Sequence, residues 1–223
     1  MPATEPTEPT EPTEPTEPTE PRAAVHLDRV TAVLGDRTVL DGVDAVFPAG
    51  VVTALTGPNG SGKSTLLDVV ADVVRPTAGR VTGLPSDGVA YVTQSVPPTT
   101  LPLTVRAAVT MGRWWHRAWW RHLGRADRAI VDAQLERMAI TDLADRPIEE
   151  LSGGQRQRTL VALGLAQRAG VLLVDEPTAG VDAESAALVV EALAAEAADG
   201  VVVVHAAHDP AAIAAADRVI ALT

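Results

Sequence analysis

The chain has 223 residues, a formal net charge of −11 and no cysteine. The acidic balance argues against electrostatic binding of nucleic acid, and the lack of cysteine excludes disulfides and thiolate metal sites. No apolar run reaches the roughly 18 residues that a membrane-spanning helix needs, and the acidic, proline-rich start is unlike a signal peptide. We therefore expect an intracellular protein that neither crosses a membrane nor binds nucleic acid.

The chain begins with a repeat. Residues 4–21 are six copies of Thr-Glu-Pro, so six of the excess acidic residues lie here and the rest of the chain carries −5. Proline at every third position excludes helix and sheet and favours polyproline II. Because the repeat has no apolar side chain to bury, we expect residues 1–22 to form a disordered tail. Its alternative roles are an inert solvating segment, or a spacer that weakly collects cations.

From residue 25 onward, short strand patterns alternate with helical patterns. The expected strands are residues 25–34, 43–47, 51–56, 80–82, 89–92, 171–175 and 201–205. The expected helices are residues 66–74, much of 104–145, 153–169, 183–198 and 210–215. Such alternation predicts an α/β fold with a mainly parallel sheet. The helical region between two of the strands predicts an inserted subdomain at about residues 95–150.

Residues 57–65 read GPNGSGKST, which fits a glycine-rich phosphate loop. Its glycines let backbone N–H groups turn toward a polyphosphate, and the next helix directs its positive end at the same anion. Lys63, the one lysine beside 17 arginines, would reach the β- and γ-phosphates, and Ser64 would bind Mg²⁺. A plain glycine turn is the alternative, but the apolar strand before it and the helix after it favour nucleotide binding. The residues expected around the phosphates are Gly57, Pro58, Asn59, Gly60, Ser61, Gly62, Lys63, Ser64 and Thr65.

Two further motifs carry polar groups. Residues 151–155 read LSGGQ before a helix, which alone could be an ordinary N-cap at Ser152. The apolar strand 171–175 ends on two acids, Asp175 and Glu176. Adjacent side chains of a strand point to opposite faces, so we expect Asp175 to face Mg²⁺ and Glu176 to face an attacking water. The alternative is an ordinary acidic turn before a proline. The presence of a phosphate loop in the same chain makes a metal-nucleotide site the favoured interpretation.

With Gln94, residues 179–182 and residues 208–209, these motifs occur in the order found in ATP-binding-cassette (ABC) ATPases. The chain resembles this family from about residue 25 to its end. The resemblance implies an ABC-ATPase fold of the P-loop NTPase class over residues 23–223. This fold is α/β, with a mainly parallel sheet, an antiparallel β edge and an inserted helical subdomain.

The resemblance also implies roles for individual residues. Glu176, His208 and Gln94 are the expected catalytic residues: Glu176 polarises water, His208 contacts the γ-phosphate and Gln94 senses Mg²⁺ and the transport partner. Mg²⁺ is expected at Ser64, Gln94 and Asp175. The cofactors implied are therefore ATP and Mg²⁺.

A second copy of the chain is implied as well. Asp182 is expected at a dimer seam. The signature residues are expected to complete the ATP site of that second copy in a head-to-tail dimer; they are Leu151, Ser152, Gly153, Gly154 and Gln155.

Two positions depart from the family pattern. The resemblance places Leu34 on the adenine side, where the family usually has an aromatic residue. Leu163-Gly164 stands where relatives often have Arg-Ala.

Local similarity around residues 104–106, 111–113 and 142–147 resembles the ATPases of zinc and manganese importers. It implies an ATPase that powers import of a divalent metal through a separate membrane permease, fed by an extracytoplasmic metal-binding protein. The chain would then lie in the cytoplasm on the inner face of the membrane. The open alternatives are a siderophore or cobalamin importer, an exporter, a soluble ATPase of translation or DNA repair, and a nucleotide-gated regulatory subunit.

Two smaller features remain ambiguous. All four tryptophans fall between Trp114 and Trp120, interleaved with arginine and histidine. They could pack the helical subdomain, or form a surface close to a membrane or partner. His205 and His208 could suggest a metal pair, but the resemblance assigns His208 to the nucleotide.

Overall fold

The structure is a computed structural model that describes residues 24–93, 103–114 and 123–223. The predicted tail, Gln94 and the tryptophans after Trp114 lie outside the described residues. Within these three ranges, none of the helices has the length and apolar character needed to cross a membrane.

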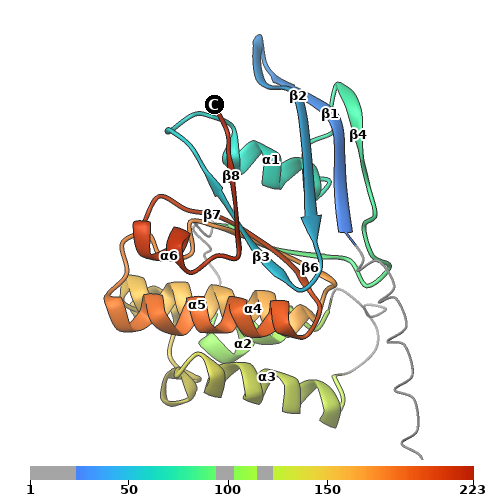
Figure 1. The fold of residues 1–223 in the computed structure, drawn as a ribbon. Helices are drawn as coiled ribbons and strands as arrows, with labels where there is room; N and C mark the ends of the chain where they lie inside the picture. The colour runs from blue at the N-terminus through green and yellow to red at the C-terminus, as the bar shows by residue number, and fades with distance from the viewer. Residues whose placement is uncertain (1–23, 94–102, 115–122) are drawn as a thin grey trace, which may run out of the picture.

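In the described residues, eight strands form two sheets (Figure 1). The first is antiparallel, with the order β2-β1-β4, and the second has the order β5-β6-β7-β3-β8 with parallel pairing. The strands are β1 (Ala24–Leu34), β2 (Arg37–Pro48), β3 (Val51–Thr56), β4 (Ala78–Thr82), β5 (Val89–Val92), β6 (Val171–Asp175), β7 (Val202–Ala206) and β8 (Arg218–Ala221). The predicted α/β class, parallel sheet and antiparallel edge are confirmed.

The helices pack on both faces of the parallel sheet. Figure 1 shows α4 and α5 against one face with α2 and α3 outside them, and α1 between the other face and the antiparallel sheet. The helices are α1 (Lys63–Val70), α2 (Val105–Met111), α3 (Arg125–Arg137), α4 (Gly153–Gln167), α5 (Ala183–Ala198) and α6 (Pro210–Ala214), with short 3-10 turns at Thr141–Leu143 and Ile148–Glu150. The inserted helical region therefore lies beside α4, away from the antiparallel sheet.

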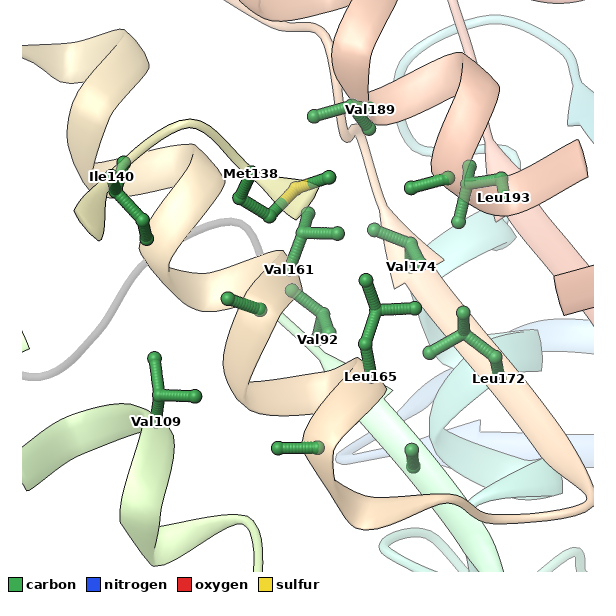
Figure 2. Packing of buried hydrophobic residues seen from close by; sticks show 14 of the residues in the cluster. Val92, Val109, Met138, Ile140, Val161, Leu165, Leu172, Val174, Val189 and Leu193 are labelled. Atoms are coloured by element: carbon green, nitrogen blue, oxygen red, sulfur yellow. The ribbon is translucent and has the colours of Figure 1, made fainter. Parts of the chain in front are cut away.

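The central strands explain this layering. Every residue of β6 and β7 is buried, as expected for apolar strands that are covered on both faces. Leu172 and Val174 of β6 face the cluster shown in Figure 2, where Val161 and Leu165 of α4 pack. The alternate residues of β6 join the opposite core with α1 and the antiparallel sheet. One strand thus joins two hydrophobic cores.

Parallel pairing places several strand ends at one edge of the sheet. Val202 of β7 pairs with both Val51 of β3 and Val171 of β6, so the three strands run in register. The phosphate-loop residues follow β3, Asp175 ends β6 and Glu176 follows it, and His208 follows β7. Ligands of open parallel sheets bind at such carboxyl ends.

The structure corrects two predicted boundaries and adds one strand that was not predicted. The helix after the phosphate loop ends at Val70 rather than residue 74, because Asp72 adopts a left-handed conformation (φ 57°) and the chain turns. Strand β2 begins at Arg37, six residues before the predicted start, since it pairs with β1 across the hairpin. The edge strand Arg218–Ala221 was not predicted, because four largely exposed residues leave no clear pattern of alternation.

Gly164 is explained by its packing. It lies on α4, and a Cβ atom there would come within 2.4 Å of Val92 Cγ2 on β5. Val92 is 3% exposed, so it has little room to move. The missing side chain at Gly164 therefore allows α4 to approach the sheet closely.

We expect Gly164→Ala to lower the free energy of unfolding by about 1–2 kcal/mol, because overpacking outweighs the roughly 1 kcal/mol that alanine gains in helix propensity. Chemical denaturation measures the change. In a Val92→Ala background the same substitution should be neutral or stabilising. A more stable Gly164→Ala protein in the original background would refute this packing explanation.

His205 lies in the core on β7 and is 2% exposed. Burial disfavours its charged form and lowers its pKa from 6.5 to about 4. The unfolded chain therefore binds more protons than the folded chain between these two values. Stability is lost as the pH falls through this window, by up to about 3 kcal/mol from this group.

We predict that His205→Leu reduces the dependence of unfolding free energy on pH between 6.5 and 4, as measured by urea denaturation at several pH values. The exposed His26 on β1 provides the matched control, His26→Leu. Equal slopes for the original chain and His205→Leu would show that His205 is not the responsible group.

Candidate functional site

The loop between β3 and α1 is shaped to bind an anion. Gly62 forms the N-cap of α1 with φ 94°, and a Cβ atom there would lie 2.7 Å from Leu40 Cδ2 and 3.0 Å from the Val39 carbonyl oxygen. Only glycine tolerates both the conformation and the approach. No side chain caps the N-terminus of α1, so its first N–H groups are directed at the loop and can bind an anion.

Lys63 adds a positive charge to the same loop. Its ammonium group donates hydrogen bonds to the carbonyl oxygens of Gly57 at 2.9 Å and Pro58 at 3.0 Å, and the residue is 6% exposed. These bonds hold the ammonium group within the loop, where a phosphate would meet it. The predicted phosphate residues therefore occupy one compact structure at the N-terminus of α1.

A cavity of about 480 Å³ opens in front of this loop. Six of the nine predicted phosphate residues line it, together with Glu176 and His208, while Pro58 and Ser61 line an adjoining cavity. The lining comprises Arg37, Val39, Asn59, Gly60, Gly62, Lys63, Ser64, Thr65, Glu176 and His208. The fold thus brings residues more than 100 positions apart in sequence to one small volume.

Asp175 lies at the end of β6 and is 8% exposed. Burial raises the pKa of its carboxyl group, Glu176 and Asp68 raise it further, and a hydrogen bond with Ser64 and the charge of Lys63 offset part of the increase. A buried carboxylate beside a hydroxyl matches the oxygen ligands that Mg²⁺ prefers. Asp175 and Ser64 therefore fit the predicted metal role, while Gln94 lies outside the described residues.

Glu176 has an unusual backbone. Its φ is 49°, a region that costs a non-glycine residue about 1 kcal/mol or more. The turn is closed by a hydrogen bond from the Ala179 N–H to the Glu176 carbonyl oxygen at 3.2 Å. The Glu176 carboxylate lies 3.1 Å from Nε2 of His208, and both side chains remain partly exposed. This geometry directs a carboxylate and an imidazole into the phosphate cavity.

The signature segment lies elsewhere. Ser152 caps α4, accepting a hydrogen bond from Gln155 N, while the Gln155 side chain accepts one from Ser152 N. Ser152 and Gly153 are exposed. None of the residues 151–155, all of which the structure describes, lines the cavity at Lys63. Within one chain the signature and the phosphate loop are therefore separate.

Asp182 holds the start of α5. Its carboxylate accepts hydrogen bonds from the Ser185 backbone N–H at 2.8 Å and the Ser185 hydroxyl at 2.9 Å, and these lower its pKa. A Cβ atom on Gly154 would lie 2.7 Å from Asp182 Oδ2 and 2.8 Å from Ser185 Oγ. The signature segment thus packs tightly against the cap of α5 in its own chain.

The adenine side, predicted at Leu34, lies next to two further residues of β2. Leu34 ends β1, is 43% exposed, and pairs across the hairpin with Arg37. The cavities next to the phosphate loop are lined by Arg37 and Val39 of β2. Neither Arg37 nor Val39 was predicted as a site residue, although the position of Arg37 across the turn from Leu34 was a usable signal.

The structure bears on the tryptophan cluster and on the pair of histidines, the two features that the sequence left ambiguous. Trp114 is 56% exposed, so this ring does not belong to the core, and the other three tryptophans lie outside the described residues. The described part of the chain contains no group of three metal-ligating side chains at His205 and His208 or elsewhere. His205 faces the core and His208 faces the cavity, which separates their roles.

Comparisons with known proteins agree with this geometry. The family model described as ABC transporter matches residues 40–179. The hemin import ATP-binding protein HmuV of Streptomyces coelicolor is 44% identical over 199 residues, which are 83% of this chain and 70% of the relative. The zinc import ATP-binding protein ZnuC of Marinobacter nauticus is 34% identical over 205 residues, 89% of this chain and 74% of the relative.

Other relatives are longer than the matched region. The chain spans 59% of the iron(3+)-hydroxamate import ATP-binding protein FhuC of Bacillus subtilis, at 38% identity over 66% of its own length. Among solved structures, an inward-facing transporter described as being of the metal-chelate type has a TM-score of 0.81 at 28% identity, covering 91% of this chain and 80% of that one. A bacterial ABC transporter cassette solved as a dimer has a TM-score of 0.77 at 25% identity, covering 89% and 94%. The predicted fold is confirmed.

The contact of Gly154 with Asp182 and Ser185 can be tested. We expect Gly154→Ala to displace one of these side chains and to lower the free energy of unfolding by about 1–3 kcal/mol. Gly153→Ala is the matched control, because its Cβ atom would meet only the Gly180 carbonyl oxygen at 3.7 Å, an ordinary contact. Denaturation curves that change equally for both variants would contradict the close packing.

Proposed function

This chain belongs to the ABC transporter family, and we propose that it is an ATP-binding subunit that hydrolyses ATP to drive a separate membrane permease. The observation that carries the proposal is the cavity shared by Lys63, Glu176 and His208. It joins an anion-binding helix end to a carboxylate and an imidazole that can act on a phosphate. A site for binding alone would not need Glu176 there.

In the proposed reaction, the phosphate-loop N–H groups and Lys63 hold the β- and γ-phosphates and neutralise charge that develops on the γ-phosphate. Ser64 and Asp175 would hold Mg²⁺, with Gln94 as a third expected ligand. When bound, Mg²⁺ supplies further positive charge to the phosphates.

Glu176 positions water and accepts its proton as the oxygen attacks the γ-phosphorus, and ADP leaves in line. The distance of 3.1 Å between Glu176 and His208 allows the imidazole to orient the carboxylate. Because His208 also lines the cavity, we expect it to contact the γ-phosphate. Gln94 is the third proposed catalytic residue. ATP and water thereby yield ADP and phosphate.

We also propose that the working unit is a head-to-tail dimer. Ser152 and Gly153 are exposed and do not line the chain's own cavity, which supports a role at the ATP site of a second copy. Capping positions Ser152 so that its hydroxyl and the first N–H groups of α4 can meet an anion. Asp182 would lie near the seam between the copies. The dimeric cassette of similar fold is consistent with this arrangement.

For the transported substrate, we propose a metal or metal chelate that is imported. The named relatives are importers for hemin, zinc and iron(3+)-hydroxamate, which supports import over export and over a soluble role in translation or DNA repair. The local motifs favour zinc or manganese, whereas the relative at 44% identity is named for hemin. The proposed partners are a permease and, through it, an extracytoplasmic metal-binding protein, which places the chain on the inner face of the membrane.

We predict that Glu176→Gln still binds ATP but loses turnover by about 10²-fold or more, because the water loses its base. Phosphate release and equilibrium binding of radiolabelled ATP separate the two effects. Glu191→Gln, an exposed glutamate on α5, is the matched control and should keep normal turnover. Turnover near the original level in Glu176→Gln would refute the assigned role.

The same variant tests the partner. Tagged Glu176→Gln, purified with ATP from native membranes, should retain a multi-span membrane protein. ATP hydrolysis by the reconstituted complex should then respond to the extracytoplasmic protein loaded with zinc, manganese or hemin. Recovery of ribosomal or DNA-repair proteins instead would overturn the transport proposal and leave the ATPase proposal standing.

A further inference from the structure

We infer that the guanidinium group of Arg37 supplies the planar surface on which the nucleobase rests, with Leu34 as its apolar support. The inference rests on the proposed binding of ATP and concerns the end of the nucleotide farthest from Glu176. It assigns a base-binding role to a residue outside the motifs of the sequence.

The hairpin register places the two side chains together. Leu34 ends β1, Arg37 begins β2, and the two residues are direct cross-strand partners. Directly opposed residues of an antiparallel pair project from the same face, with Cβ atoms about 4.5–5.5 Å apart. The aliphatic part of Arg37 can therefore lie along Leu34, and its guanidinium extends beyond it.

Arg37 stands where two cavities meet. It lines the phosphate cavity of about 480 Å³ and also an adjoining cavity of about 610 Å³. The adjoining cavity is bounded by β2, by Pro58, Asn59, Gly60 and Ser61 of the phosphate loop, and by the end of β8 with the residues after it. Its position and size suit the ribose and base of a nucleotide whose phosphates lie at Lys63.

The chemistry of the lining favours Arg37. The described residues that line these two cavities include no phenylalanine, tyrosine or tryptophan, and the one imidazole, that of His208, lies 3.1 Å from Glu176 at the phosphate end of the site. A nucleobase stacks on aromatic rings or on the flat face of a guanidinium group, and Arg37 is the one such group in the lining. Within the described ranges Arg37 forms no ion pair, whereas the nearby Asp44 accepts a hydrogen bond from the Arg29 N–H. Its guanidinium plane is therefore available to a ligand.

A guanidinium platform has a consequence for specificity. Stacking uses the flat face that every base possesses and reads no pattern of hydrogen bonds. The chain should therefore bind ADP and GDP with affinities that differ by less than about fivefold. An Arg37 that served the phosphates would instead act on any polyphosphate, with or without a base.

The two roles are distinguished by calorimetric titration of the full chain with ADP and, separately, with inorganic pyrophosphate, both with Mg²⁺. For Arg37→Ala we expect affinity for ADP to fall about tenfold and affinity for pyrophosphate to change less than twofold. Arg37→Tyr should keep ADP affinity within about threefold, because it restores a flat surface, whereas Arg37→Lys should not. Leu34→Tyr in the Arg37→Ala chain should also recover binding.

The matched control is Arg80→Ala, which removes an exposed arginine from β4 of the same small sheet and should leave both affinities unchanged. An equal loss of ADP and pyrophosphate affinity in Arg37→Ala would show a phosphate contact and overturn the inference, as would unchanged ADP affinity. An original chain that binds neither ligand would overturn the proposed function as well. Binding of both ligands with no effect of Arg37 would overturn the inference alone.

Discussion

The structure depends on the parallel pairing of β6 with β7 and of β7 with β3. These strands are buried on both faces, so their position is fixed by two hydrophobic cores rather than one. Their shared direction brings the phosphate loop, Asp175, Glu176 and His208 to a single edge. The polar residues need not bond to one another in order to come together. The apolar packing beneath them already fixes where each strand ends. Glu176, whose φ of 49° is a strained conformation, directly follows a fully buried strand, and such strain persists only where the surrounding structure fixes the backbone.

Electrostatics then divides the site into regions with different tasks. At the N-terminus of α1, Lys63 and uncapped N–H groups concentrate positive character. Behind them, burial disfavours the negative charge of Asp175, so a cation at this position relieves a cost that the fold has imposed. In front, Glu176 and His208 stay partly exposed and in contact. The ligand that we propose, a magnesium-bound polyphosphate, would suit all three regions, since it would present anions to the helix, a cation to the carboxylate and a reactive phosphorus to Glu176.

The sequence predicted the parts of this arrangement that are local. The strands β5 and β6 and the helix α5 have the predicted bounds, because long apolar runs, a capping Asp182 and neighbouring turn residues leave little choice. The phosphate-loop motif was equally clear, because its glycines and Lys63 stand at the spacing typical of phosphate binding.

Features that depend on contacts between residues far apart in the sequence could not be predicted from local patterns. The absence of a side chain at Gly164 depends on Val92, and the place of Arg37 beside the phosphate loop depends on hairpin register and on the packing of β2 against that loop. Edge strand β8 is held by pairing with β3 and has little apolar pattern of its own.

Within each chain, one contact links the segment proposed to act at the second copy's ATP site to the segment that follows Glu176. Gly154 belongs to the segment that we assign to the ATP site of the second copy, whereas Asp182 follows Glu176, which we assign to the chain's own site. The side chains of Asp182 and Ser185 lie directly against Gly154, with no room for a methyl group. A shift of the signature segment toward a nucleotide on the second copy must therefore move the cap of α5, and with it the short connection back to Glu176. Tightly packed contacts transmit displacements rather than absorbing them. In the proposed dimer, occupation of one ATP site would thus bear on the position of the carboxylate at the other, through a path of a few adjacent residues in each chain.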